Sequence, residues 1–185
     1  MLVAHIAPLL PPDASVLDVG SGDGFVAESV MRARPDVTIS GVDPLVRPGA
    51  RIPVREFDGL SIPFPDRSFD ATLIVDVLHH ATDPQRLLAE AVRVTRDCLV
   101  IKDHRREGLL AGATLRFMDA IGNRRHGVSL PYNYLAPAQW AAAFADLGIA
   151  PDAEIRRLGL YPWPASLLFD RSLHFIARLR RVDAG

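Results

Sequence analysis

The fold is decided by the stretch Val16-Leu17-Asp18-Val19-Gly20-Ser21-Gly22-Asp23-Gly24, a short apolar run that ends in three alternating glycines. Its apolar residues are typical of a β-strand that is covered on both faces. The glycines remove the Cβ atoms that would keep a ligand away from the backbone, and the segment that follows carries its apolar residues on one helical face. A strand, a tight turn and a helix N-terminus in this order predict a site for a nucleotide-like ligand.

The spacing of the glycines narrows the class of ligand. A dinucleotide-binding turn has the spacing G-x-G-x-x-G, with its third glycine one position later than Gly24. Phe25 occupies that position here. The segment instead resembles motif I of the class I S-adenosylmethionine-dependent methyltransferases, and this resemblance implies a loop that holds the methionine part of the cofactor.

A second strand is predicted over residues 37–43, and it ends in a carboxylate 19 residues after Gly24. This distance allows a helix, a turn and a strand, so a right-handed βαβ unit would bring Asp43 beside the glycine turn. A carboxylate in that place can accept hydrogen bonds from both hydroxyls of a ribose. The alternative is that Asp43 only caps the loop before Pro44.

Two further segments extend the resemblance. Residues 57–70, FDGLSIPFPDRSFD, and residues 76–84, DVLHHATDP, are similar to consecutive segments of the type 11, ubiquinone-biosynthesis-like methyltransferases. The resemblance implies that Asp58 receives the adenine amino group and that the backbone near Gly59 lines the base. The full set of implied cofactor contacts is Asp18, Gly20, Ser21, Gly22, Gly24, Asp43, Pro44, Asp58, Gly59 and Asp76. The implied cofactor is S-adenosyl-L-methionine, its product is S-adenosyl-L-homocysteine, and no metal is expected.

Length and composition indicate a single compact domain over residues 1–185, which the resemblance implies is a methyltransferase domain. The chain is 49% apolar but contains no run of 18 apolar residues, which disfavours a membrane span. Its net charge of −1 disfavours a nucleic-acid partner bound through phosphates. Residues 2–10 are apolar but lack a basic leader, and the single cysteine, Cys98, lies in a strand-like run. These features predict a cytoplasmic protein without a signal peptide or a disulfide.

Alternating strands and helices indicate an α/β fold, a Rossmann-like doubly wound sheet that is mostly parallel. Strands are expected near residues 14–20, 37–43, 52–57, 69–75, 98–103, 152–160 and 172–180, and helices near residues 23–34, 84–95, 109–121 and 136–147. The segment Tyr161-Pro162-Trp163-Pro164 between the last two strands is too short for a crossover helix. It therefore predicts a terminal antiparallel hairpin.

Residues 104–135 are an expected insertion that selects the acceptor. Five arginines lie between His104 and His126, namely Arg105, Arg106, Arg116, Arg124 and Arg125. They suit either a solvated helix face or a site that attracts an anionic acceptor. Tyr132, Tyr134 and Trp163 suit either an acceptor pocket or loop anchors.

Methyl transfer needs a general base only where the acceptor must lose a proton, because the sulfonium is already an activated leaving group. The candidates are His79, His80, Asp103, His104 and His126. We predict His104 as the catalytic base, since it follows the fifth strand and enters the insertion. His79 and His80 are expected to shape the turn beside the cofactor.

The sequence thus predicts an S-adenosylmethionine-dependent methyltransferase that acts on a small-molecule acceptor. One alternative is a non-catalytic or regulatory domain with a reduced acceptor site, because only about ten residues precede Pro11 where family members carry lid helices. A nicotinamide-dependent oxidoreductase is disfavoured by Phe25 and by the expected hairpin. No motif defines the acceptor, the choice among C-, N- and O-methylation, or the oligomeric state.

Overall fold

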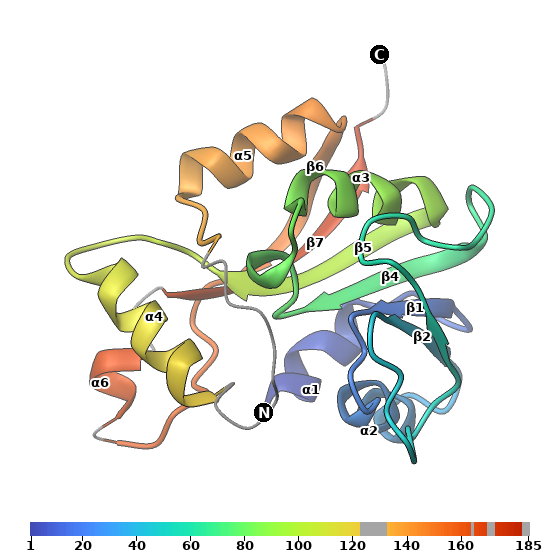
Figure 1. The fold of residues 1–185 in the computed structure, drawn as a ribbon, viewed down its shortest axis with the longest axis horizontal. Helices are drawn as coiled ribbons and strands as arrows, with labels where there is room; N and C mark the ends of the chain where they lie inside the picture. The colour runs from blue at the N-terminus through green and yellow to red at the C-terminus, as the bar shows by residue number, and fades with distance from the viewer. Residues whose placement is uncertain (123–132, 164, 170–172, 183–185) are drawn as a thin grey trace.

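A single mixed β-sheet organises the molecule. The computed structural model describes residues 1–122, 133–163, 165–169 and 173–182. Within these residues a seven-stranded sheet has the order β3-β2-β1-β4-β5-β7-β6 (Figure 1). The strands are β1 (Ser15–Val19), β2 (Thr38–Asp43), β3 (Val54–Glu56), β4 (Phe69–Val75), β5 (Thr95–His104), β6 (Ile149–Ile155) and β7 (His174–Arg181).

The direction of the strands confirms the predicted fold class. Strands β1 to β5 pair in parallel, and β7 lies antiparallel both to β5 and to β6. The sheet is therefore a mostly parallel α/β sheet with a terminal antiparallel hairpin. Parallel strands bring their carboxyl ends to one edge, where ligands bind in open α/β sheets.

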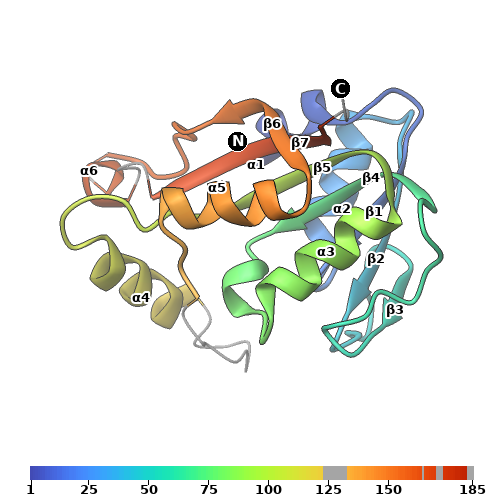
Figure 2. The ribbon, with the colours of Figure 1, turned by 90° about the horizontal axis from the view of Figure 1, so that it is seen from above.

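Helices cover both faces of the sheet (Figure 2). The helices α1 (Leu2–Ile6) and α2 (Phe25–Ala33) pack on one face, and α3 (Pro84–Val94) and α5 (Pro137–Asp146) pack on the other. Each face has its own hydrophobic core, and Trp140 and Phe144 of α5 are buried in the core under α3 and α5. The core under α1 and α2 contains Ile6 and Val30, which pack against the opposite side of the sheet.

Two more helices lie beyond the carboxyl end of β5. They are α4 (Ala111–Gly122) and α6 (Ser166–Phe169), and both views set them apart from the layers on the sheet (Figures 1 and 2). Leu115 of α4 packs with Tyr134 and Leu173 in a small separate core. In the described parts of the chain, no helix combines the length and the apolar character that a membrane crossing requires.

The hairpin was predicted with wrong boundaries. Strand β6 spans Ile149–Ile155 instead of residues 152–160, and the connection to β7 is longer than expected and contains α6. After Ile155 the chain leaves the sheet and buries Leu158 in the core that α1 covers, where the Leu158 carbonyl oxygen lies 3.0 Å from Nε2 of His5. At Gly159 the backbone has φ +59°, which no strand adopts.

Candidate functional site

The glycine loop after β1 is held by the end of β2. The backbone N–H groups of Gly20 and Ser21 donate to the carbonyl oxygen of Val42, at 2.8 and 3.2 Å. Gly20 has φ +72°, and a Cβ atom there would lie 2.5 Å from a methyl carbon of Val77. At Gly22, with φ +59°, a Cβ atom would meet nothing within 4 Å. The loop is therefore closed on the side of Val77 and open at Gly22.

Asp43 joins the end of β2 to this loop. Its Oδ2 accepts a hydrogen bond from the N–H of Gly22 at 2.8 Å, and its Oδ1 accepts one from the N–H of Leu45 at 2.8 Å. The loop-capping role considered for Asp43 is thus present in the structure. A carboxylate has about four lone-pair sites, so these two bonds leave acceptor capacity for ribose hydroxyls.

Asp58 lies after β3 and is exposed. Its Oδ1 accepts hydrogen bonds from the N–H groups of Leu60, at 2.8 Å, and Ser61, at 2.6 Å. The bond from Ser61 and then that from Leu60 hold the pKa of Asp58 below its ordinary value. Gly59, with φ +79°, stands close to Pro44, since a Cβ atom there would lie 3.7 Å from its ring. The residues expected at the base and the ribose therefore come from neighbouring loops.

Asp18 is placed differently from the other predicted cofactor contacts. It lies inside β1 and is only 3% exposed. Burial, and to a lesser extent the negative charge of Asp43, raises the pKa of Asp18 to about 7. This carboxyl group is buried within the strand that precedes the loop.

Asp76 follows β4 in a strained backbone conformation. Its φ of +56° is uncommon for a residue with a Cβ atom. Both carboxylate oxygens contact Nζ of Lys102, at 2.5 and 2.6 Å, and Lys102 is itself buried. Burial would raise the pKa of Asp76, but the charges of Lys102, His104 and His79 together outweigh it, and the pKa lies below its ordinary value.

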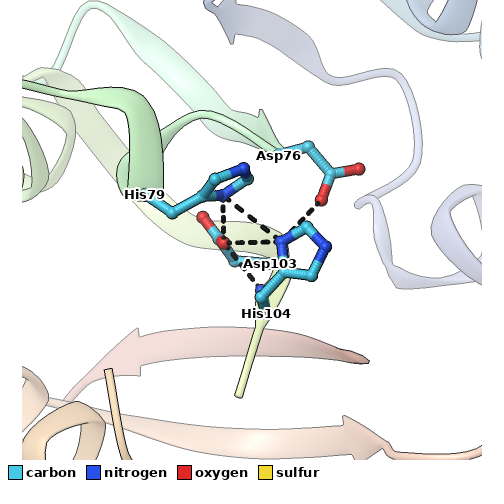
Figure 3. A group of neighbouring side chains, drawn as sticks. All are labelled: Asp76, His79, Asp103 and His104. Atoms are coloured by element: carbon cyan, nitrogen blue, oxygen red, sulfur yellow. Dashed lines mark hydrogen bonds and ion pairs between the residues drawn. The ribbon is translucent and has the colours of Figure 1, made fainter. Parts of the chain in front are cut away.

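Asp76 and three other side chains from the ends of β4 and β5 converge (Figure 3). We call Asp76, His79, Asp103 and His104 the Asp–His cluster. Nδ1 of His79 lies 2.6 Å from Oδ1 of Asp103. Nδ1 of His104 lies 3.4 Å from Nδ1 of His79 and 3.5 Å from carboxylate oxygens of both Asp76 and Asp103.

Asp103 is the most deeply buried member of the cluster. The N–H groups of Leu78 and His104 donate to its two oxygens, at 3.1 and 2.6 Å. Burial would raise its pKa, but the charge of His79, the hydrogen bond from His104 and that from His79 together depress the pKa well below its ordinary value. Asp103 is therefore an anion in the folded protein.

Aromatic and imidazole rings surround the cluster. Tyr134 stacks on His79, with ring centroids 5.6 Å apart, and contacts His104 edge-on. His174 of β7 stands directly opposite His104 of β5, and their rings are 4.7 Å apart. Trp163 is 79% exposed and its part in an acceptor pocket stays a prediction, while Tyr132 and His126 lie outside the described residues.

The predicted arginine site is only partly described. Arg105 is buried and forms an ion pair with Glu154, with Nη1 2.5 Å from Oε1. Arg106 and Arg116 are exposed, and Arg124 and Arg125 lie outside the described residues. Since Arg105 already has a carboxylate partner, the attraction of an anionic acceptor would depend on the other arginines.

The sequence did not indicate Lys102 and His174 as members of this site. A lysine beside Asp103 in an otherwise apolar run, Leu99-Val100-Ile101, was a signal that could have been used for Lys102. No comparable signal exists for His174, because its position depends on the antiparallel register of β7 against β5.

Known proteins are similar to this chain in sequence. The sequence profile of a methyltransferase domain family matches residues 17–98. A methyltransferase of Mycobacterium sp. (strain JLS) is 41% identical over 93 residues, which cover 46% of this chain and 36% of that protein. The demethylmenaquinone methyltransferase of Renibacterium salmoninarum is 33% identical over 138 residues, or 68% of this chain and 58% of that protein.

A solved structure extends the likeness to the whole fold. An S-adenosylmethionine-dependent methyltransferase from Thermotoga maritima superimposes with a TM-score of 0.70 at 21% identity, over 97% of this chain and 87% of that one. The sheet order and the glycine loop define a class I methyltransferase fold. With the profile match, residues 17–98 are similar to the type 11 family of S-adenosylmethionine-dependent methyltransferase domains. It spans 36% of the length of the first curated relatives it matches.

Proposed function

We propose that this protein transfers a methyl group from S-adenosylmethionine to a small-molecule acceptor. One observation carries the proposal above the others. The ends of β1, β2 and β4 bring an open glycine loop, Asp43 and Asp76 to one edge of the sheet, and the polar Asp–His cluster follows directly after. This adjacency supports a methyl donor site beside a polar reaction site.

The residues present fit the cofactor. The open side of Gly22 gives the methionine part access to the backbone of the loop, together with Gly20, Ser21 and Gly24. Asp43 retains acceptor capacity for the ribose hydroxyls, and the ionised Asp58 can accept from the amino group of adenine. Pro44 and Gly59 would then border the base from two loops.

The protein has little covalent chemistry to perform. When bound, the cofactor supplies a methyl group already activated on a positively charged sulfur. The chain has to hold the acceptor in line with that group and exclude water. Where the acceptor must lose a proton, His104 is the proposed base, because it follows β5 and its Nδ1 lies 3.5 Å from carboxylate oxygens of both Asp76 and Asp103.

The relatives support a small acceptor. The protein from Renibacterium salmoninarum is named for its action on demethylmenaquinone, a small organic molecule. For this chain we propose the same coarse class, with Tyr134 offering an aromatic surface beside the cluster.

Isothermal titration calorimetry tests the cofactor assignment. We expect S-adenosylmethionine and S-adenosylhomocysteine to bind with one site per chain, and NADH to give no saturable heat. Absence of binding below about 1 mM would sink the proposal, because such a site supplies only ~4 kcal/mol. Tight binding of NADH would instead support an oxidoreductase.

A matched pair of variants tests whether the adenine of the cofactor binds beside Asp58. Asp58→Asn keeps the oxygen that caps Leu60 and Ser61 but removes the charge that would face adenine. The control is Asp66→Asn, which changes an exposed carboxylate in the same segment. We expect S-adenosylhomocysteine affinity to fall only in the first variant, and equal affinities would remove Asp58 from the site.

A further inference from the structure

We propose that the Asp–His cluster binds one divalent transition-metal ion, with a carboxylate oxygen from each of Asp76 and Asp103 and Nδ1 from each of His79 and His104. This departs from the expectation of no metal. The proposal concerns ion binding by this chain and stands whether or not S-adenosylmethionine binds.

The donor atoms have the spacing that a small ion requires. The four ligand atoms lie within 4.8 Å of one another. A tetrahedral ion with ligands at about 2.0 to 2.1 Å needs ligand atoms about 3.3 to 3.4 Å apart. The three contacts of Nδ1 of His104 measure 3.4, 3.5 and 3.5 Å. The pair formed by His79 and Asp103, at 2.6 Å, would have to open.

Protons alone do not satisfy this arrangement. A proton on Nδ1 of His79 accounts for its short contact with Asp103. Nδ1 of His104 faces that same nitrogen, and its carboxylate contacts at 3.5 Å are longer than the 2.7 to 3.2 Å of ordinary N–H···O bonds. An ion at the centre would turn these long contacts into ligand bonds.

The charge of the cluster also favours a cation. It contains two carboxylates, and the neighbouring Lys102 is paired with one of them, that of Asp76. Asp103 contacts Nδ1 of His79 and accepts hydrogen bonds from the backbone N–H groups of His104 and Leu78. A divalent ion bound by both carboxylates would neutralise the charge of the pair.

The groups around the cluster can orient the ligands. Lys102 can stay on Oδ2 of Asp76 while Oδ1 binds the ion, and the N–H of Leu78 already holds Oδ2 of Asp103. Outer contacts of this kind fix metal-binding side chains in place. They leave the two oxygens in the cluster directed at the same point as the imidazoles.

An independent observation comes from His174. This residue is 4% exposed, and neither of its ring nitrogens has a hydrogen-bond partner in the described part of the protein. Buried polar atoms without partners are rare. His174 packs against His104, so a water or an acceptor group bound to the ion could form a hydrogen bond with one of these nitrogens.

The donor set selects the class of ion. Two imidazoles and two carboxylates suit Zn²⁺, Mn²⁺, Fe²⁺ or Co²⁺ better than Ca²⁺, which prefers six to eight oxygen ligands. Beside the proposed methyl donor site, such an ion could bind an acceptor oxygen and lower its pKa. It would then replace His104 as the group that activates the acceptor.

The test uses tag-free, full-length protein stripped with EDTA. Calorimetry and thermal unfolding are measured with ZnCl₂ and with MnCl₂, and elemental analysis is done after gel filtration. We expect about one ion per chain with at least one of these metals, and a higher Tm in its presence. We expect His104→Ala and Asp76→Asn each to weaken binding at least ~10-fold. Circular dichroism confirms that each variant is folded.

His5→Gln is the control, because His5 lies on α1 and contacts Leu158 instead of the cluster. It should bind the ion like the wild type. No saturable binding of either metal would overturn the proposal, and so would equal binding by the wild type and both cluster variants. Titration of S-adenosylhomocysteine into the same samples reports separately on the methyl donor site.

Discussion

At the residue scale, Asp18 links the pH to the stability of the fold. Burial and the nearby charge of Asp43 raise its pKa from 3.8 to about 7. Between these values the folded chain keeps a proton that the unfolded chain has lost, so this carboxyl group makes stability fall as the pH rises. In the wild type, we expect this group to lower the free energy of unfolding by on the order of 4 kcal/mol between about pH 4 and about pH 7. Asp18→Asn should remove this decrease.

Urea denaturation across this pH range measures the effect. Asp66→Asn, at an exposed carboxylate, should keep the slope of the wild type. An unchanged slope in Asp18→Asn would show that Asp18 titrates normally in the folded protein.

Substitutions at two neighbouring glycines of the loop are expected to have different effects, the one at Gly20 mainly on stability and the one at Gly22 mainly on ligand binding. In Gly20→Ala the new Cβ atom would meet Val77 at 2.5 Å in a backbone with φ +72°, and we expect a loss of ~1–3 kcal/mol in stability. In Gly22→Ala nothing lies within 4 Å, so only the left-handed backbone opposes the change, at ~1 kcal/mol.

The binding of S-adenosylhomocysteine should respond differently in the Gly22 variant. The methyl group of the new alanine would stand on the open side of the loop, where the ligand is expected. We therefore expect the affinity for S-adenosylhomocysteine to fall by at least ~10-fold, at this small cost in stability. Chemical denaturation and calorimetry on the same protein measure both quantities. Wild-type affinity in Gly22→Ala would mean that the ligand does not approach the loop there.

Much of the candidate site could be predicted residue by residue, because most of its carboxylates directly follow or end a predicted strand. Asp43 and Asp76 lie at the ends of β2 and β4 as expected, beside the loop. What could not be predicted is how the side chains pair across strands. Lys102 reaches Asp76 from a neighbouring strand, and His174 faces His104 only through the register of β7.

At the scale of the elements, α5 fixes the end of β5. The indole N–H of Trp140 donates to the carbonyl oxygen of His104 at 3.1 Å, and Trp140 is buried. We expect Trp140→Phe to lower the free energy of unfolding by ~1–3 kcal/mol, because a buried carbonyl loses its partner. Trp163→Phe, at an exposed position, should change it by less than ~0.5 kcal/mol. Equal stabilities in urea would contradict this role of α5.

The elements predicted from apolar periodicity agree with the structure, whereas those set by distant packing do not. Strands β1, β2 and β4 start and end within one residue of the expected ranges. Strand β6 ends five residues early because Leu158 is buried under α1, a contact between the two ends of the chain. Periodicity within a short window carries no information about such a contact.

At the scale of the whole molecule, one edge of the sheet gathers residues from distant parts of the chain. The parallel order of β2, β1, β4 and β5 brings together the glycine loop, Asp43 and the Asp–His cluster, and β7 adds His174 from the end of the chain. This is why a fold class predicted from three motifs located the proposed donor site but left the acceptor side open.

The most direct test of the proposed donor site is a crystal structure of the protein with S-adenosylhomocysteine. We expect its methionine part to lie on the open side of Gly22, its ribose hydroxyls to contact Asp43, and its adenine to approach Asp58. Its sulfur should face the Asp–His cluster. A ligand bound elsewhere, or bound at the loop with its sulfur turned away from the cluster, would contradict the account.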